Sequence, residues 1–372
     1  MSDVEETPVE SVSDEVLRQA AQAQAPPLPR SPRPIVIIGA GGIVRAAHLP
    51  AYEKAQFPVI AIADSSAGKA AELAENHKVG RAFDSVTDAV AFAPKDCVFD
   101  VAVPAADLQS VLQQLPCGAA VLMQKPMGET LQQARSIRDL CRTRGLSAAV
   151  NFQLRFAPAH LGAQGLANAG ALGELHDIEV QVRTYTPWQL WTFLASAPRL
   201  EILYHSIHYL DLVRAWLGTP RSIYAKTTRN PHTAQLAATR TVMILDYGDD
   251  KRVFIATNHG HRFARKSQLS FVQWEGTGGA IRMGMGVNLD YPRGEPDTLE
   301  FAPYGGAPWQ DLPVSGNWFP DAFIGSMGSL QAFVEGSAVT LPTGYESAYE
   351  TMVLVEAAYR SSEHGGEPVE IQ

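Results

Sequence analysis

Repeated alternation of short apolar runs with helical stretches, between residues 34 and 151, constrains the fold more than any other feature of this chain. Apolar runs that predict strands lie at residues 35–38, 59–63, 98–103, 119–123 and 146–151. Stretches that predict helices lie at residues 43–54, 69–76, 86–92, 106–115 and 130–144. Continuous apolar runs are typical of parallel strands that are buried on both faces. The pattern therefore predicts an α/β domain with a doubly wound parallel sheet over residues 34–155.

A glycine-rich turn, Gly39-Ala40-Gly41-Gly42, follows the first predicted strand and precedes a predicted helix. In a dinucleotide fold the first glycine makes the tight turn, and the second lets a pyrophosphate approach the backbone at the helix N-terminus. Val44 occupies the third position of the G-x-G-x-x-G pattern, so the fingerprint is imperfect and a simple turn is the alternative. The candidate cofactor residues of this turn are Gly39, Gly41, Gly42 and Ile43.

Asp64 ends the second predicted strand, 25 residues after Gly39. An acidic residue there can accept hydrogen bonds from ribose hydroxyls while it repels a 2′-phosphate. Neither Ser65 nor Ser66 supplies the positive charge that NADP would need. We therefore expect NAD in preference to NADP, although Asp64 could also cap the helix at 69–76.

Polar and turn residues converge on one edge of the predicted sheet. The residues at the carboxyl ends of its strands are Gly39, Asp64, Pro104, Gln124 and Asn151. Ligands of open α/β sheets bind beyond these ends. Lys125 lies on the same rim, where an amine can donate to a carbonyl or alkoxide oxygen, or act as the acid or base of hydride transfer. Alone it would be weak evidence, since most lysines are solvated surface charges.

Several motifs, in this order, resemble those of the Gfo/Idh/MocA oxidoreductases (glucose-fructose oxidoreductase, inositol dehydrogenase and MocA). They are Gly39-Ala40-Gly41, Ala47-His48-Leu49-Pro50, Asp64, Lys125-Pro126, Asn151…Arg155-Phe156…Pro158, His208-Tyr209-Leu210-Asp211 and Ala357-Ala358-Tyr359. The resemblance spans roughly residues 34–363. It implies an NAD(P)-binding Rossmann domain, a second domain with an open, mostly antiparallel sheet, and chemistry at a secondary alcohol of a sugar or polyol. It also implies that Lys125 is catalytic or orients substrate, and that His208 is a candidate general base.

Two positions depart from the pattern of that family. Gln124 replaces its usual glutamate, and the lost negative charge should make Lys125 easier to deprotonate. Tyr204 stands where the family often has an aspartate. In a helix over 202–216, Tyr204, His208 and Asp211 would share one face, so Asp211 or His205 could orient His208. Both histidines could instead be structural. The predicted substrate residues are Lys125, Asn151, Arg155, Tyr204, His205 and His208.

From residue 176 the pattern changes to strict alternation, which predicts half-buried strands. Ile178, Val180 and Val182 would face one way, and similar strands are expected at 222–228, 239–247, 252–259, 269–275 and 280–283. The turn signal Asp249-Asp250 indicates antiparallel pairing. We therefore expect a substrate-binding and oligomerisation domain of α+β type over 156–372. An open sheet face tends to be buried against another subunit, which predicts a homo-dimer or homo-tetramer.

An aromatic segment, residues 185–191, follows the first of these strands. Its rings could stack on the apolar face of a pyranose, or could simply pin a long loop. The candidates for shaping a pocket are Arg183, Trp188, Trp191, Arg199 and Trp318.

The charge balance bears on possible partners. Thirty Lys and Arg against 39 Asp and Glu give a net charge of -9, which argues against nucleic-acid or anionic-membrane partners. The three cysteines, Cys97, Cys117 and Cys141, include no C-x-x-C pair, so we expect no disulfide framework and no metal. A reducing, cytoplasmic location fits this pattern.

The first 33 residues combine an acidic start with a proline-rich stretch and lack the features of a signal peptide. We expect a flexible N-terminal arm over 1–33, either a disordered leader or an arm that packs on a neighbouring subunit.

Two functions remain open from the sequence. One is an NAD(P)-dependent dehydrogenase or reductase of a sugar, polyol or glycoside, in which Lys125 and His208 handle the proton and the cofactor could stay bound through a cycle. The other is a nucleotide-binding redox sensor or scaffold without turnover. Val44, Gln124 and Tyr204 favour the sensor, whereas Lys125 and His208 favour chemistry.

Overall fold

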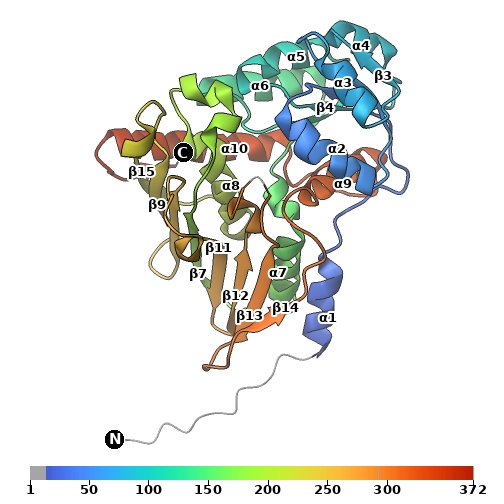
Figure 1. Ribbon diagram of the computed structural model, residues 1–372. Helices are drawn as coiled ribbons and strands as arrows, with labels where there is room; N and C mark the ends of the chain where they lie inside the picture. The colour runs from blue at the N-terminus through green and yellow to red at the C-terminus, as the bar shows by residue number, and fades with distance from the viewer. Residues whose placement is uncertain (1–13, 292, 372) are drawn as a thin grey trace, which may run out of the picture.

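The computed structural model describes residues 14–291 and 293–371, and within them six strands form a parallel sheet (Figure 1). The strands are β1 (Ile35–Ile38), β2 (Val59–Ala63), β3 (Arg81–Phe83), β4 (Val98–Val101), β5 (Ala120–Met123) and β6 (Ser147–Val150). Their order is β3-β2-β1-β4-β5-β6, and all neighbours are parallel. This order reverses direction between β1 and β4, so the predicted doubly wound sheet is confirmed.

The helices of this layer lie close to their predicted places. They are α2 (Leu49–Lys54), α3 (Lys69–Asn76), α4 (Val86–Phe92), α5 (Leu108–Gln114) and α6 (Leu131–Arg144). The helix expected over 43–54 is divided, because a π-helical turn at Val44–His48 precedes α2. The short edge strand β3 was not predicted, since its largely exposed residues form no apolar run.

A segment from the far end of the sequence completes the first layer. Helix α9 (Ala322–Glu335) packs beside α2, and its Phe323, Met327 and Leu330 share a core with Ile35 and Tyr52. Figure 1 shows α9 next to α2 despite their distance in sequence. The hydrophobic core of the first sheet therefore includes a helix from beyond residue 155, the predicted end of the first domain.

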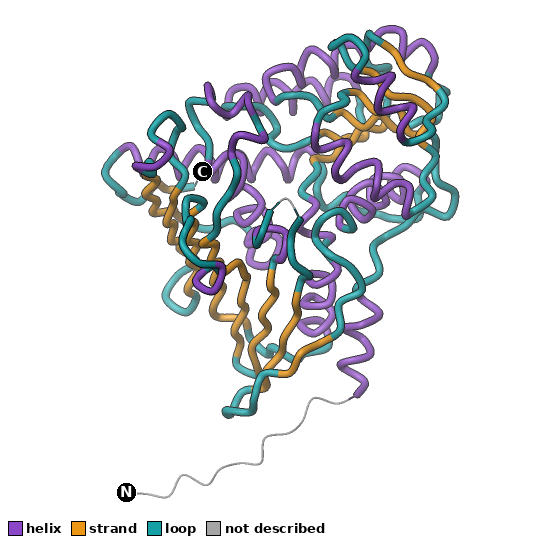
Figure 2. The backbone as a smooth tube through the Cα atoms, viewed as in Figure 1, coloured by secondary structure: helices purple, strands orange, loops and turns teal. Residues whose placement is uncertain are grey.

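The second sheet contains nine of the described strands and runs diagonally across Figure 2. They are β7 (Leu175–Arg183), β8 (Ser222–Thr228), β9 (Arg240–Asp246), β10 (Arg252–Asn258), β11 (Leu269–Gly276), β12 (Gly279–Gly284), β13 (Thr298–Pro303), β14 (Gln310–Leu312) and β15 (Val369–Glu370). The order is β14-β13-β12-β11-β7-β10-β9-β8-β15. The β7–β10 pair is parallel and the other pairs are antiparallel, which confirms a mostly antiparallel sheet.

One face of this sheet is covered by helices and the other is open. Ile178, Val180 and Val182 point into the core, as the alternation predicted. The covering helices are α7 (Pro158–Asn168), α8 (Ile207–Leu217) and α10 (Tyr345–Glu363). On the open face, Tyr224 pairs with Ile244 across β8 and β9, and both side chains are exposed.

Residues 14–33 correct the expectation of a free arm. Helix α1 (Asp14–Ala23) packs on α7, where a Cβ added to Gly165 would lie 2.7 Å from the Cβ of Ala23. The backbone amide of Arg33 then donates to the side chain of Gln331 in α9, at 2.7 Å. This part of the arm belongs to the chain's own fold because small residues in α7 let α1 approach closely. The rest of the predicted arm, residues 1–13, lies outside the described residues.

None of the helices in the described part of the chain is long and apolar enough to cross a bilayer. Over the same residues, no group of three or more His, Cys, Asp or Glu side chains is arranged to hold a metal ion.

Candidate active site

The glycine turn after β1 leaves open space above the sheet. Gly39 has φ +106°, and a Cβ there would lie 2.3 Å from the carbonyl oxygen of Ala102, so the position requires glycine. In contrast, a Cβ on Gly41 or Gly42 would meet nothing within 4 Å. The backbone is therefore exposed at the point where a dinucleotide fold receives a pyrophosphate.

The carboxylate of Asp64 holds this turn from the neighbouring strand. Its Oδ2 accepts from the backbone amide of Ala40 and its Oδ1 from that of Ser66, both at 2.7 Å. Partial burial opposes ionisation, but these hydrogen bonds and the charge of Lys69 lower the pKa of Asp64 overall. Each carboxylate oxygen keeps a free lone pair for a ribose hydroxyl. Asp64 does not cap α3, because the residue at that N-cap is Gly68.

Backbone hydrogen bonds bring the other strand ends to the same edge. The amide of Gln124 donates to Val101 at 2.8 Å, and that of Asn151 donates to Met123 at 2.7 Å. The amide of Ala102 bonds Ile38 at 2.8 Å, two residues before the exposed Pro104. The predicted cofactor positions therefore lie side by side along one rim.

Lys125 points from this rim to the second domain. Its Nζ donates to the backbone carbonyl of Tyr204 at 2.7 Å. Burial lowers the pKa of Lys125 from 10.5 to about 8. Tyr204 belongs to a π-helical turn, Ile202–Ser206, which precedes α8, and π-turns of this kind are frequent at functional sites. Tyr204 therefore contacts Lys125 through its backbone carbonyl oxygen.

Two neutral histidines accompany Lys125. Burial, with a contribution from the charge of Lys125, lowers the pKa of His208 well below 6.5. Burial and the neighbouring His259, Lys125 and His208 do the same to His205. The ring of His208 lies between Phe152 and Trp318, at centroid distances of 6.4 and 5.6 Å. Its buried Nδ1 has no hydrogen-bond partner among the described residues. The site therefore holds a histidine that is uncharged at neutral pH.

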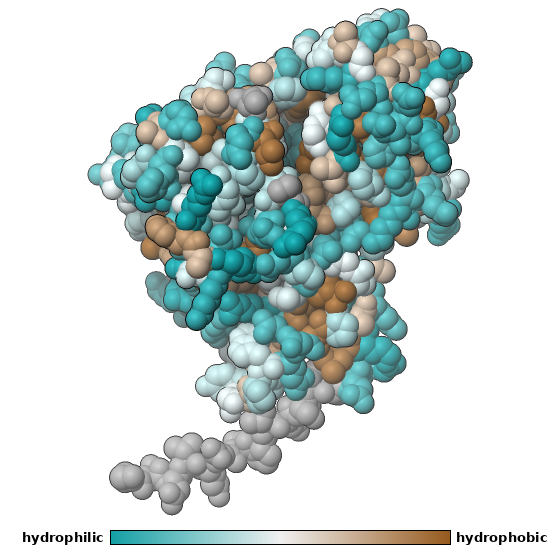
Figure 3. Space-filling view, viewed as in Figure 1, coloured by the Kyte–Doolittle hydropathy of each residue, from teal (hydrophilic) through white to brown (hydrophobic). Residues whose placement is uncertain are grey.

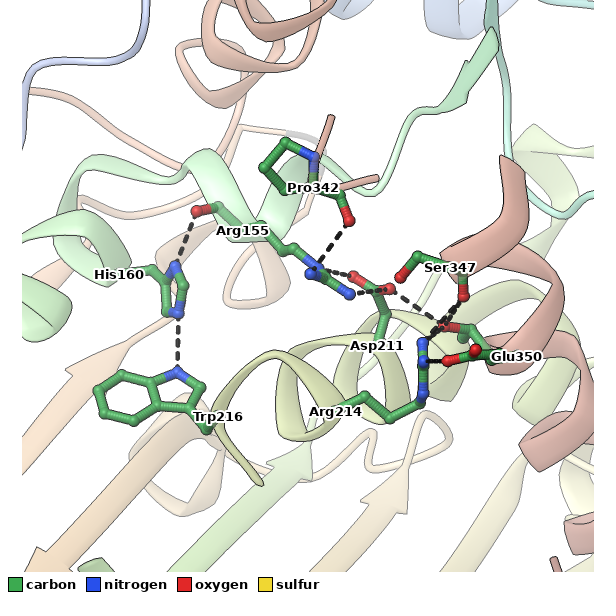
Figure 4. Close-up of polar contacts among 9 residues, drawn as sticks. Arg155, His160, Asp211, Arg214, Trp216, Pro342, Ser347 and Glu350 are labelled. Atoms are coloured by element: carbon green, nitrogen blue, oxygen red, sulfur yellow. Dashed lines mark hydrogen bonds and ion pairs between the residues drawn. The ribbon is translucent and has the colours of Figure 1, made fainter. Parts of the chain in front are cut away.

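Asp211 does not orient His208. Its two carboxylate oxygens accept from Arg155 Nε and Nη2 at 2.6 and 2.7 Å (Figure 4). The hydroxyl of Thr351 also donates to one of these oxygens, at 3.1 Å. The π-turn changes the register of Tyr204 relative to His208 and Asp211, which both lie in α8, so the three side chains do not follow the expected i, i+4, i+7 alignment.

Arg155, a predicted substrate residue, makes its contacts within the protein. Besides the bidentate pair with Asp211, its carbonyl accepts from Nδ1 of His160 at 2.8 Å (Figure 4). Nε2 of His160 in turn accepts from the indole of Trp216 at 2.9 Å. Arg155 thus ties the inter-domain segment to α8, and we leave it out of the proposed site.

A buried polar chain runs from the core of the first sheet to Gln124. Nδ1 of His48 lies 2.6 Å from Asp100 Oδ2, which also accepts from the hydroxyl of Tyr52 at 2.8 Å. The side-chain amide of Asn151 lies 3.5 Å from Nε2 of His48 and donates to Oε1 of Gln124 at 2.9 Å. His48, Asp100 and Asn151 are fully buried. The chain fixes the orientation of Gln124, immediately before Lys125.

A second buried cluster lies behind His205. The ring centroids of His205 and His259 are 4.4 Å apart, and Trp188 packs on both at 4.9 and 5.6 Å. Nδ1 of His259 lies 2.9 Å from the hydroxyl of Thr186, and Nε2 lies 3.4 Å from the buried carboxylate of Glu201. Although burial opposes it, hydrogen bonds with His259, Thr241 and Ser206 lower the pKa of Glu201.

Sequence reasoning missed some of these residues. Asp100 carried a usable signal, since a carboxylate inside a strand buried on both faces needs partners. Glu201 and His259 carried no such signal, because their pairing depends on how the second sheet folds.

Figure 3 shows that the face seen there is hollowed where the first and second domains meet.

Two family models match consecutive parts of the chain. Residues 33–152 match the oxidoreductase family with NAD-binding Rossmann fold, and residues 160–282 match the Gfo/Idh/MocA C-terminal domain. Together they span about two thirds of the chain.

Curated relatives match different shares of the chain. D-glucoside 3-dehydrogenase of Escherichia coli (strain K12) is 29% identical over 56% of this chain and 60% of the enzyme. D-apiose dehydrogenase of Paraburkholderia graminis is 22% identical over 88% of this chain and 87% of the enzyme. An uncharacterized oxidoreductase of Synechocystis is 27% identical, with 41% of its length matched. The first of these relatives are thus matched over about two fifths to three fifths of their own length.

Solved structures share the fold. An Agrobacterium radiobacter oxidoreductase in complex with NAD+, L-tartaric acid and magnesium has a TM-score of 0.77 at 19% identity, over 92% of this chain and 99% of that one. A putative myo-inositol dehydrogenase of Sinorhizobium meliloti 1021 has a TM-score of 0.72 at 19% identity, over 91% and 100%.

Proposed function

This chain belongs to the Gfo/Idh/MocA oxidoreductase family, and from that premise we propose that it transfers a hydride between NAD and a secondary alcohol or ketone carbon of a sugar, polyol or glycoside. The observation that carries the proposal is the position of Lys125. Its amine lies on the NAD-side rim, reaches the second domain, and has its pKa lowered to about 8 by burial.

The residues present fit NAD. The open backbone at Gly41 and Gly42 leaves room for a pyrophosphate, and we assign the ribose hydroxyls to the carboxylate of Asp64 beside this turn. Gly39, Ile43 and Pro104 complete this cofactor surface, with Gln124 and Lys125 at its far end. A negative charge at Asp64 disfavours a 2′-phosphate, so NADP is the less suitable cofactor.

When bound, NAD supplies the hydride acceptor or donor, and the chain's own residues handle the proton. In alcohol oxidation, neutral Lys125 takes the hydroxyl proton on Nζ, because burial makes neutral His208 the weaker base of the two. In ketone reduction, protonated Lys125 donates to the carbonyl oxygen. Tyr204 and His205 shape the surface on which the substrate lies, and the buried Asn151, expected to bind substrate, acts instead through Gln124, which it holds in place.

The experiment is a substrate screen of the purified chain. NAD is added with a panel of sugars, polyols and glycosides, and the near-ultraviolet absorbance of NADH is followed. NADH formed with a member of the panel supports the proposal. Absorbance that is present before any addition and is bleached by a keto-sugar would identify an enzyme that retains its cofactor. NADH binding with no response to any alcohol or ketone would instead favour the sensor or scaffold.

The remaining proposals concern assembly and location. The open sheet face at Tyr224, Val242 and Ile244 supports a homo-dimer or homo-tetramer. Cys97 and Cys141 are buried free thiols and Cys117 is an exposed one, which supports a reducing, cytoplasmic compartment. Sedimentation of the purified chain and fractionation of the host cell test these two proposals separately.

A further inference from the structure

Gln124 ends β5 on the side of the sheet that belongs to the second half of a dinucleotide. The strand order reverses between β1 and β4, and dinucleotides bind across such a reversal. With the adenosine ribose assigned to Asp64, after β2, the nicotinamide nucleoside belongs over the ends of β4 and β5. The half-buried side chain of Gln124 is therefore a candidate contact of that nucleoside.

The hydrogen bonds behind Gln124 begin at a buried carboxylate. Oδ2 of Asp100 accepts from the hydroxyl of Tyr52 at 2.8 Å and lies 2.6 Å from Nδ1 of His48. Because a carboxylate oxygen can only accept, Nδ1 is the ring nitrogen that carries the proton. Nε2 of the same ring then has a lone pair, and it faces the side-chain amide of Asn151 at 3.5 Å.

This lone pair determines how the next two amides are turned. An NH2 group donates, so Asn151 presents Nδ2 to Nε2 of His48, and the same Nδ2 donates to Oε1 of Gln124 at 2.9 Å. An Asn151 amide turned the other way would set its oxygen against the lone pair of His48. The oxygen of Gln124 is thus in use. Its Nε2 is not fully buried, makes no hydrogen bond among the described residues, and is left with two N–H donors.

Two donors held in this direction suit an oxygen that accepts. The nicotinamide nucleoside offers the carbonyl oxygen of its carboxamide and the oxygens of its ribose hydroxyls. A glutamate of the same shape could only accept at this position. The Gln124 amide cannot turn without loss, because its NH2 group would then meet the NH2 group of the fully buried Asn151.

We propose that Gln124 donates from Nε2 to an acceptor oxygen of the nicotinamide nucleoside of NAD, and that Asn151, His48 and Asp100 are positioning residues for this amide. The inference rests on the NAD binding in the proposed function, and not on hydride transfer. It makes a carboxylate in the core of the first sheet part of cofactor recognition, since that carboxylate determines which way an amide on the rim is turned.

The first test measures NADH binding through the fluorescence of the cofactor. NADH is used because its nicotinamide ring carries no positive charge that a carboxylate could attract. Gln124→Leu removes the donors and should weaken binding about three- to tenfold, the contribution of one hydrogen bond. Gln124→Glu keeps the shape but presents an acceptor to an acceptor, and should weaken binding more. Gln113→Glu, at an exposed glutamine of α5, is the matched control and should bind like the wild type.

The second test separates positioning from a general structural role. Asn151→Ala leaves the Gln124 amide free to turn, and should weaken NADH binding about two- to fivefold, the cost of ordering one side chain. Combined with Gln124→Leu, it should cause no further loss, because the donors are already absent. His48→Ala should show the same dependence on Gln124. Equal losses in both backgrounds would overturn the positioning role.

Cofactor analogues identify the accepting oxygen. Reduced thionicotinamide adenine dinucleotide has sulfur in place of the carboxamide oxygen, and two further analogues lack the 2′- or the 3′-hydroxyl of the nicotinamide ribose. The difference in affinity between the wild type and Gln124→Leu should vanish with the analogue that lacks the accepting oxygen and persist with the others. A difference that persists with all three, or equal binding of NADH by the wild type and Gln124→Leu, would overturn the proposal.

These measurements do not depend on turnover. If the effect of Gln124 on binding is found and no sugar, polyol or glycoside reacts, the proposed function fails and the role of Gln124 stands. If NADH is formed from a substrate while Gln124→Leu binds NADH like the wild type, the proposed function stands and this inference fails.

Discussion

The amine of Lys125 and the backbone carbonyl of Tyr204 are joined by a 2.7 Å hydrogen bond that links the cofactor side of the structure to its second domain. The bond stretches from the end of β5 to the π-turn before α8. It orients an amine that burial makes easier to deprotonate, between the NAD rim and two neutral histidines. The proposed chemistry depends on this arrangement.

The pH dependence of turnover should follow Lys125. A lysine with a lowered pKa loses its proton as the pH rises, so kcat/KM for alcohol oxidation should rise with pH, reach half of its plateau at about pH 8 and level off above it. Gln124→Glu adds a negative charge that favours the protonated amine and should move this limb to higher pH. A limb that stays in place in Gln124→Glu would contradict the assigned role of position 124.

Cofactor preference should depend on Asp64. Asp64→Asn keeps the shape but weakens acceptance from the ribose hydroxyls, so NAD should bind about tenfold more weakly, since hydrogen bonds to charged groups contribute roughly 1.5–3 kcal/mol. Binding of NADP should change less because a repulsive charge is also removed. Fluorescence titration with both cofactors measures the two affinities. The exposed Asp96→Asn is the control, and a preference that does not narrow in Asp64→Asn would contradict the role of this carboxylate.

The series of buried hydrogen bonds that ends at Gln124 should contribute strongly to the stability of the protein. His48→Ala leaves the buried carboxylate of Asp100 with Tyr52 as its remaining side-chain partner, and should reduce the free energy of unfolding by about 3–5 kcal/mol. His77→Ala breaks a histidine–carboxylate contact with Glu53 near the surface, and should reduce it by about 1 kcal/mol at most. Urea unfolding measures the free energy of unfolding of both variants. Equal decreases in His48→Ala and His77→Ala would contradict a special contribution of the buried hydrogen bonds to stability.

Assembly should depend on the open sheet face. Ile244→Asp places a charge where two sheets would meet and should lower the mass measured by light scattering. Val339→Asp, at a side chain that is 97% exposed, should leave the mass unchanged. If the mass of Ile244→Asp equals that of the wild type, another surface makes the assembly.

Most of the fold could be predicted from the sequence because its signals are local. Apolar runs such as 35–38 and the alternation at 178–182 predict most strands of both sheets, whereas β3, β13, β14 and β15 were not predicted. The placement of α9 on the first sheet and of α1 on α7 could not be predicted, because both depend on contacts between distant segments. At Gly162 and Gly165 of α7, small residues permit the approach of α1, but a sequence does not show which segment will use the space.

The sequence predicted the part of the site that lies at the carboxyl ends of the parallel strands. The convergence of Gly39, Asp64, Gln124 and Asn151 follows from the geometry of parallel sheets. The partners of single side chains could not be predicted: Asp211 pairs with Arg155 and not with His208, and Arg155 is 56 residues away in the sequence. The sequence could not predict the neutral state of His208 either, because the lowered pKa depends on burial of the ring beside Phe152 and Trp318.

The central claim is that Lys125 handles the proton of hydride transfer to NAD. The most direct measurement compares the rate of NADH formation by the wild type, Lys125→Ala and the exposed Lys95→Ala with the best compound of the screen, after NAD binding has been measured in all three. The account predicts that Lys125→Ala binds NAD but is slower by about 10²–10⁴-fold, the usual contribution of general acid–base catalysis, while Lys95→Ala matches the wild type. Equal rates in Lys125→Ala and the wild type would contradict it.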